Sequence, residues 1–312
     1  MVIRLPRKLP RKATIGIVSP ASPQRDVKRL ERGIAYLEGM GHTVVCAPNA
    51  LAVHGGYLAG TQDQRIADLH MMFADKRIDA IFCARGGYGS AQLLRDLDYD
   101  LIRKNPKILV GFSDITALQL ALFKKTGLVT FSGAMPSVDM ADEFSPISEE
   151  WFWRVLRSTR PLGKLSQPFP FEILKKGNSK GLLLGGNLTV ATSLVGTPFM
   201  PTLTGNILVL EDIGEETYRI DRMLQQLVNS GVWERLGGVV FGKWTQGAPA
   251  LGRSTPARDV NEVLTDFAVM CRGPVLSKFM YGHETLKFTL PMGVHCRLTA
   301  RGLTVTGSAV QD

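Results

Sequence analysis

The chain has 312 residues, of which 45% are hydrophobic and 21% charged, and its formal net charge is +9. This composition is typical of a globular protein with one large domain or two ordinary ones. No apolar run approaches the roughly 20 residues that a membrane-spanning helix needs, which excludes a membrane-spanning protein. The positive charge favours an anionic ligand. However, the basic residues are spread along the chain without the aromatic-and-basic stripe of nucleic-acid binders, so a solvated basic surface is favoured and no nucleic-acid partner is expected.

The N-terminal segment and the cysteines indicate the cellular location. Residues 1–16, MVIRLPRKLPRKATIG, are basic and lack the apolar stretch of a signal peptide, so we expect a frayed arm before the first strand. The four cysteines form no Cys-x-x-Cys pair, and Cys46 and Cys83 lie in apolar runs typical of small buried side chains. This usage favours a reducing, cytoplasmic compartment.

The first half alternates strand-like and helix-like segments. The expected strands are 14–22, 42–48, 79–84 and 108–110, and the expected helices are 26–41, 61–75 and 117–123. This rhythm predicts a parallel sheet with helices on both faces. Ligands of such sheets bind at the C-terminal ends of the strands, where loops begin at Ser19, Arg85 and Phe112.

The pattern weakens between about 135 and 180, where prolines and a short helix at 151–156 indicate a connection between domains. The second half starts at 179–198 and continues with a strand, a polar loop and an amphipathic helix in 205–231, a strand at 237–246, a helix at 259–271 and a hairpin at 296–310. The sequence therefore predicts an α/β protein with an N-terminal domain over 1–140, a linker over 141–180 and a smaller domain over 181–312.

A strand-to-helix turn holds the first candidate for chemistry. In PKILVGFSDITALQLALF, Ser113 and Asp114 separate a short buried strand from a run of helix formers. A serine on such a turn can act as a nucleophile elbow, which lifts Oγ into a cleft and places the next N–H beside an oxyanion. GFSDI does not match the G-x-S-x-G pattern, and Ser and Asp are both favoured N-cap residues. From this stretch alone, helix capping is the favoured interpretation.

A general base is best sought among the five histidines. His42 opens a strand, His70 falls within a helix and His295 lies in the C-terminal hairpin, whereas His54 and His283 lie in glycine-containing loops. His283, in KFMYGHETLKFTLPMG, is a better base candidate than a histidine on a helix face, although an exposed side chain without a role is the commoner case. No metal-ligand spacing such as H-E-x-x-H occurs, so we expect no metal.

An orienting carboxylate is available in VLEDIGEETYRIDRML (209–224). Its acids are Glu211, Asp212, Glu215, Glu216 and Asp221. One of them can hold a histidine tautomer and stabilise its charged form. The alternative is that acids gather near a helix N-terminus because the macrodipole favours them there. Composition does not choose among them.

The segment RGGYGS (85–90) follows a strand and has glycines at 86, 87 and 89. Such a loop can expose backbone N–H groups to a phosphate or to an oxyanion. It lacks the Lys of a P-loop and the spacing of a dinucleotide fingerprint, so a nucleotide site is disfavoured. A tight turn without a ligand is the alternative.

Taken together, RGGYGS, GFSDIT, GGNL, LEDIGEETYRIDRML and GHETLKFTLPMG resemble, in this order and spacing, the LD-carboxypeptidases, serine peptidases of murein recycling. GIVSPAS and LAGTQDQR are similar to the same family, and the resemblance spans roughly residues 14–295. It implies an N-terminal flavodoxin-like domain and a smaller C-terminal α/β domain with the cleft between them. It also implies a homodimer that works in the cytoplasm without a cofactor.

The resemblance assigns roles to individual residues. Ser113 would be the nucleophile, Glu215 the triad carboxylate and His283 the base. The oxyanion hole would be formed by the N–H of Asp114 and by an N–H of the RGG loop, from either Gly86 or Gly87.

The implied substrate is the murein tetrapeptide that ends in diaminopimelate-D-Ala. Backbone N–H groups of the glycine loop or the side chain of Arg85 could recognise its terminal carboxylate. The residues after the histidine vary in the family, and here the charged Glu284 and Lys287 bear on the peptide preference.

Two other functions compete. The first is an immunity-type peptidase that hydrolyses a peptidyl-nucleotide antibiotic, for which Trp151, Phe152 and Trp153 could supply an aromatic platform for the nucleobase. The second is a non-catalytic module that binds an anion at RGGYGS. It leaves the Ser, Glu and His loops unexplained and ranks last.

Overall fold

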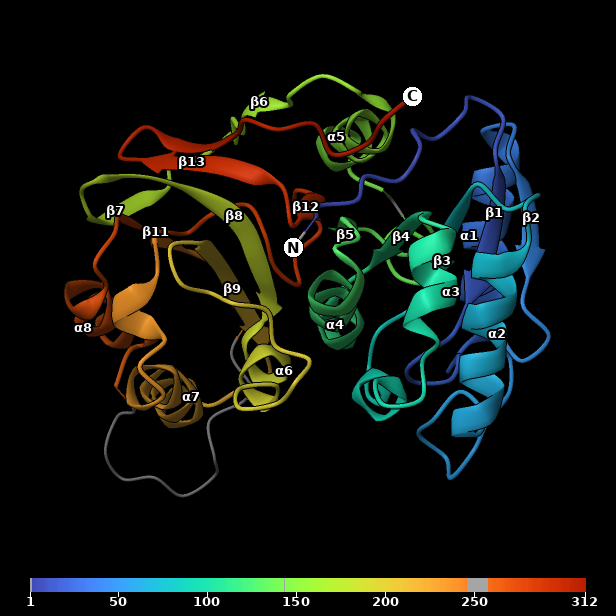
Figure 1. Cartoon of the computed structure of the whole chain (residues 1–312), viewed down its shortest axis with the longest axis horizontal. Helices are drawn as coiled ribbons and strands as arrows, with labels where there is room; N and C mark the ends of the chain where they lie inside the picture. Colours follow the sequence, from blue (N-terminus) through green and yellow to red (C-terminus); the bar gives the residue numbers. More distant parts are fainter. Residues whose placement is uncertain (1, 143, 246–257) are drawn as a thin grey trace.

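Two β-sheets, each with its own helices, lie side by side (Figure 1). The structure is a computed structural model that describes residues 2–142, 144–245 and 258–312. The first sheet consists of β1 (Thr14–Val18), β2 (Thr43–Cys46), β3 (Ala80–Cys83), β4 (Ile108–Gly111), β5 (Thr130–Ser132) and β12 (Leu290–Met292). The second consists of β6 (Gly163–Lys164), β7 (Glu172–Lys175), β8 (Asn178–Asn187), β9 (Ile207–Ile213), β10 (Gly238–Thr245), β11 (Val275–Ser277), β13 (His295–Thr299) and β14 (Gly302–Val305).

The first sheet has the strand order β12-β5-β4-β3-β1-β2. Strands β1 to β5 are mutually parallel and follow the flavodoxin-like order 2-1-3-4-5. The predicted fold class is therefore confirmed. The sixth strand, β12, pairs antiparallel with β5 although it comes from the last tenth of the chain, and this pairing was not predicted.

Helices cover both faces of the first sheet because successive strand residues point to opposite sides. Ile15, Ile17 and Phe82 pack in one core with helices α1 (Val27–Gly39) and α5 (Pro146–Arg157). Val18, Ile81 and Leu109 pack in the other with α2 (Gln62–Ala74), α3 (Tyr99–Lys104) and α4 (Thr116–Thr126). The helix ends follow local chemistry. Asp26 caps α1, a capping box starts α2, and Gly127 ends α4 in the left-handed conformation.

The second sheet has the order β6-β14-β13-β8-β9-β10-β11-β7, and its β8 to β11 core is parallel. Its helices are α6 (Leu188–Ser193), α7 (Thr217–Asn229) and α8 (Val260–Met270), and short 3-10 helices occur at Ser90–Leu93, Ser113–Ile115 and Trp233–Arg235. The strand expected at 237–246 is β10, and its last residue, Gln246, lies outside the described residues. None of the helices in the described ranges combines the length and apolarity that crossing a bilayer requires.

The structure corrects three expectations. The N-terminal arm is not frayed, because the N–H of Arg4 donates to the carbonyl of Gly127 at 2.8 Å and Leu9 is buried. Cys46 is exposed, since its strand β2 lies at the sheet edge. The segment 141–180 is more than a connection: α5 packs its aromatic side chains into the first core, and β6 and β7 join the second sheet.

Specific polar contacts join the two parts. The hydroxyls of Ser132, at the end of β5, and Tyr281, after β11, lie 2.7 Å apart in a buried hydrogen bond. The Thr116 hydroxyl at the start of α4 accepts a hydrogen bond from the N–H of Asn187 at 3.1 Å. Both contacts lie at the C-terminal ends of parallel strands. They therefore fix the loops of one sheet against those of the other.

We predict that Tyr281→Phe lowers the free energy of unfolding by about 1 to 2 kcal/mol, because the buried hydroxyl of Ser132 loses its partner. Urea denaturation measures this change. Tyr57→Phe, whose ring is 53% exposed, is the matched control and should leave stability unchanged. Equal stability of the two variants would show that the contact between Ser132 and Tyr281 contributes nothing.

Candidate active site

The turn after β4 holds Ser113 in a strained conformation. Its φ is 63°, in the left-handed region that side chains other than glycine rarely adopt. Phe112 and Asp114 on either side are buried, whereas Ser113 is partly exposed. No side chain caps the 3-10 helix that begins at Ser113 or the helix α4 that follows. The helix-capping interpretation is therefore wrong. The left-handed backbone conformation of Ser113 instead directs its side chain away from the core.

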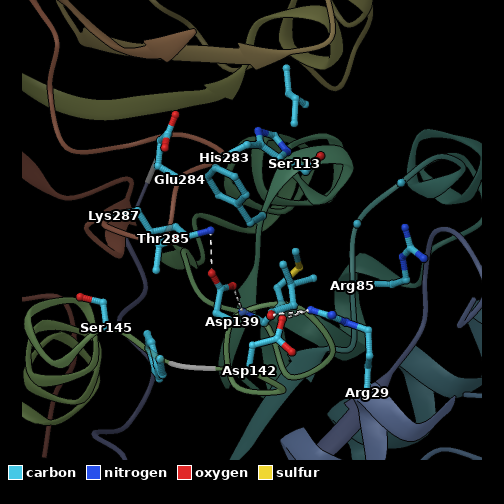
Figure 2. Close-up of a pocket in the computed structure, with 17 residues that line it drawn as sticks. Arg29, Arg85, Ser113, Asp139, Asp142, Ser145, His283, Glu284, Thr285 and Lys287 are labelled. Carbon is cyan, nitrogen blue, oxygen red and sulfur yellow. Dashed lines mark hydrogen bonds and ion pairs between the residues drawn. The ribbon is translucent and has the colours of Figure 1, made fainter. Parts of the chain in front are cut away.

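Ser113 lines a cavity of about 480 Å³ together with His283, Gly86, Phe112 and Arg85. Figure 2 shows Ser113 and His283 beside each other at one end of this cavity. Further lining residues come from the segment after β5, from the end of β9 and from the loop after β11. The cavity therefore lies where the C-terminal ends of strands from both sheets meet.

A buried carboxylate holds His283 in place. Nδ1 of His283 lies 2.7 Å from Oε2 of Glu211, whose side chain is 0% exposed. The imidazole also packs against the ring of Phe112, with ring centroids 4.9 Å apart. Because Nδ1 is bound to a carboxylate, it carries the proton of the neutral ring and leaves Nε2 as the basic nitrogen.

The expected partner, Glu215, does not contact His283. Its carboxylate lies 3.5 Å from the hydroxyl of Thr189 and 3.7 Å from the guanidinium of Arg219. The carboxylate that contacts His283 is Glu211 instead, four residues earlier in the same motif. One signal in the sequence was available: Glu211 stands within the apolar strand ILVLEDI, and a carboxylate buried there is costly unless it has a partner.

A second layer of hydrogen bonds holds the carboxylates at the end of β9. The side-chain amide of Asn187 donates to Asp212 at 2.7 Å and to Oε1 of Glu211 at 3.4 Å. Asp212 also accepts from the N–H and the hydroxyl of Thr189 at 2.9 and 2.7 Å. Burial raises the pKa of Glu211, and the hydrogen bond with His283 opposes that rise.

The glycine loop packs directly on the serine. A Cβ at Gly86 would lie 2.9 Å from Cβ of Ser113 and 3.3 Å from its Oγ, so only glycine fits there without movement. Gly87 is in the left-handed region and faces Ser22 instead. Both glycines line the cavity.

The second half of the same loop is already occupied by a carboxylate. Asp114 accepts a hydrogen bond from the N–H of Ser90 at 2.8 Å, and Gly89 also donates to it. The buried guanidinium of Arg65 donates to the carbonyl of Gly89 at 2.9 Å. These N–H groups therefore fix the loop to the turn that carries Ser113 and are not open to an outside anion.

The cavity wall also carries paired charges. Lys287 and Asp139 form a buried ion pair of 2.7 Å, and the ammonium lies 4.9 Å from the centroid of Phe112. Figure 2 shows this pair below His283 and Glu284, and all four residues line the cavity. Arg85 is half-buried on the other side, where its guanidinium donates to the carbonyl of Pro23 at 3.3 Å.

The remaining candidates lie elsewhere. The aromatic side chains Trp151, Phe152 and Trp153 are buried in the first core and do not line the cavity, so they form no exposed platform. His54 is exposed in its loop, and His42 is buried in a stack with Trp153. In the part of the chain that the structure describes, no group of three or more His, Cys, Asp or Glu could hold a metal ion.

Comparisons with known proteins agree with the motifs. The LD-carboxypeptidase N-terminal domain matches residues 15–133, and the LD-carboxypeptidase C-terminal domain matches residues 180–298. A probable murein peptide carboxypeptidase of Bacillus subtilis is 36% identical over 309 residues, which cover 98% of this chain and 95% of that protein.

Solved structures show the same fold. The muramoyltetrapeptide carboxypeptidase of Oxalobacter formigenes superposes with a TM-score of 0.82 at 29% identity, over 96% of this chain and all of that one. The microcin C7 self-immunity protein MccF in complex with aspartyl sulfamoyl adenosine superposes with a TM-score of 0.89 at 26% identity, over 99% of this chain and 100% of that one.

The raised pKa of Glu211 predicts a pH-dependent effect on stability. A carboxyl whose pKa is raised in the folded protein binds its proton more tightly there than in the unfolded chain. It stabilises the fold fully below its ordinary pKa of 4.5, and this stabilisation is lost as the pH rises toward the pKa of the folded protein. Glu211→Gln stays neutral at every pH. Its free energy of unfolding relative to wild type should therefore rise above pH 4.5, by up to about 1.4 kcal/mol per pH unit.

Urea denaturation across this pH range measures the difference. Glu215→Gln, on the same loop but not bonded to His283, is the matched control and should follow the wild-type profile. A difference between Glu211→Gln and wild type that stays flat or shrinks with rising pH would contradict the prediction.

Proposed function

The chain belongs to the LD-carboxypeptidase family, and from this premise we propose that it is a serine carboxypeptidase that releases C-terminal D-Ala from murein tetrapeptide. The observation that carries the proposal is the convergence of Ser113 and the pair of His283 and Glu211 on one cavity. The carboxylate in this assignment is Glu211 and no longer Glu215. The names of the relatives support a peptidase that acts on murein peptides.

The geometry supports a two-step acyl transfer. His283 Nε2 takes the proton of Ser113 Oγ as the oxygen attacks the carbonyl carbon between the L-centre of the penultimate residue and D-Ala. Glu211 holds the proton on Nδ1 and stabilises the imidazolium that forms. The imidazolium then gives its proton to the amine of the departing D-Ala. Water, deprotonated by His283, hydrolyses the ester on Ser113 and restores the hydroxyl.

The oxyanion of each tetrahedral intermediate needs two aligned donors. We assign them to the N–H of Asp114 and to an N–H of the glycine loop. Gly86 is favoured over Gly87 because it lies against the Ser113 side chain. The bonds from Ser90 to Asp114 keep the loop and the turn in a fixed relative position, as preorganised donors require.

An exopeptidase must also recognise the free C-terminus. Arg85 directly precedes the glycine loop and lines the cavity. No ion pair to Arg85 is found among the described residues, so its guanidinium is available to the terminal carboxylate of the substrate. We assign it that role.

The immunity-type activity remains the second candidate, because the similarity to MccF spans nearly the whole chain. The burial of the tryptophans removes the platform that the sequence offered for a nucleobase. The murein peptide is therefore the favoured substrate. A homodimer, a cytoplasmic location and a place in cell-wall recycling are further parts of the proposal that rest on the family resemblance.

We predict that Ser113→Ala reduces D-Ala release by several orders of magnitude, because the acyl-enzyme cannot form. Mass spectrometry of murein tetrapeptide incubated with the wild type and the variant measures release. The matched control is Ser193→Ala on the exposed face of α6, which should retain full activity. Undiminished release by a folded Ser113→Ala variant would refute the assignment. Faster hydrolysis of a peptidyl nucleotide than of the tetrapeptide would favour the second candidate.

A further inference from the structure

A second cavity opens beside the catalytic one. It has a volume of about 230 Å³ and shares Arg29, Arg85 and Val138 with the catalytic cavity. Its remaining wall is formed by residues 24–26, just before α1, and by Ser137. The two cavities are therefore neighbours, and Arg85 lies in the wall of both.

Three arginines surround this second cavity. Arg25 is exposed at its rim, Arg85 is half-buried at the junction, and Arg29 forms part of the wall. The pKa of Arg85 is lowered, chiefly by burial and then by the positive charges of Arg25 and Arg29, which places the three cations close to one another. Like charges held together in this way need a counter-charge.

The protein supplies only part of that counter-charge. Arg29 is neutralised by Asp142 at 2.5 Å and also donates to the carbonyls of Ser137 and Val138, so it is a wall element. Asp26 caps α1 through the N–H of Lys28 and lines the same cavity. Within the described ranges no ion pair involves Arg25. The lining of the second cavity thus holds three arginines and one aspartate, and Asp142 is shared between Arg29 and Arg32 outside it, so an excess of positive charge remains for an anionic ligand.

We propose that this second cavity binds a carboxylate of the peptide substrate other than the terminal one, with Arg25 as the residue that recognises it. The inference rests on the proposed function and extends it to the substrate class. In a peptide that ends in diaminopimelate-D-Ala, the penultimate side chain carries a free carboxylate several bonds from the scissile carbonyl. Arg85 then holds the terminal carboxylate and Arg25 the side-chain one, so the enzyme selects free-acid peptides over amidated peptides.

The charge of this lining alone does not separate a carboxylate from a phosphate monoester, which carries close to two negative charges at neutral pH. The carboxylate is favoured because the substrate of the proposed function carries carboxylates and no phosphate. Binding of AMP, which is a phosphate monoester, tests experimentally whether the cavity prefers a phosphate to a carboxylate.

The test compares two tetrapeptides that differ only at the penultimate side chain, which ends in a carboxylate or in a carboxamide. Calorimetry measures their binding to Ser113→Ala, and mass spectrometry measures D-Ala release by the enzyme with Ser113 intact. Each measurement is repeated with Arg25→Gln and with Lys28→Gln. The latter removes the same charge from an exposed position of α1 outside the cavity. Both residues are exposed, so neither change threatens the fold.

The free-acid peptide should bind about tenfold more tightly than the amide, as expected for one charge-assisted contact. Arg25→Gln should abolish this preference and Lys28→Gln should keep it. Equal affinity for both peptides, or a preference that survives Arg25→Gln, would overturn the subsite even if D-Ala is released. Discrimination in binding without any release by the active enzyme would refute the proposed reaction and leave the subsite standing. Arg25-dependent binding of AMP without discrimination between the peptides would assign the cavity to phosphate and overturn the inference.

Discussion

The hydrogen bond between His283 and the buried Glu211 is the interaction on which the site depends. The Glu211 side chain has no exposed surface and lies near the end of an apolar strand, where burial raises its pKa. Such a position is tolerated because Asn187 and His283 both bond to the carboxylate. The same bond fixes which nitrogen of the imidazole faces the cavity. The contact between His283 and Glu211 therefore affects both the stability of the fold and the basicity of Nε2 in the cavity.

The topology explains how groups so distant in sequence meet. Ser113 follows β4 in the first sheet, whereas Glu211 lies near the C-terminal end of β9 and His283 follows β11 in the second. In parallel sheets the C-terminal strand ends carry the ligand-binding loops. The chain returns from the second sheet to the first at β12, which pairs with β5, and the hydroxyls of Tyr281 and Ser132 form a hydrogen bond between the two parts. Each lobe therefore completes the site of the other.

Local patterns predicted most of the fold and part of the site. The alternation of strands and helices gave the parallel sheet, and the family resemblance selected Ser113 and His283, which the structure brings to one cavity. The sequence did not identify Glu211 as the partner of His283. That pairing depends on which residue of a strand faces a loop 72 residues later in the chain. The edge strand β12 was missed for the same reason: its pairing partner lies in the other half of the chain.

Reaction with a fluorophosphonate tests the central claim most directly, because this electrophile modifies a serine only when a base activates it. Peptide mapping by mass spectrometry should find a single adduct, on Ser113. Labelling should be abolished in His283→Ala, slowed in Glu211→Gln and unchanged in Glu215→Gln. An adduct on another serine, or labelling of Ser113 that persists at the wild-type rate in His283→Ala, would contradict the proposed row of Ser113, His283 and Glu211.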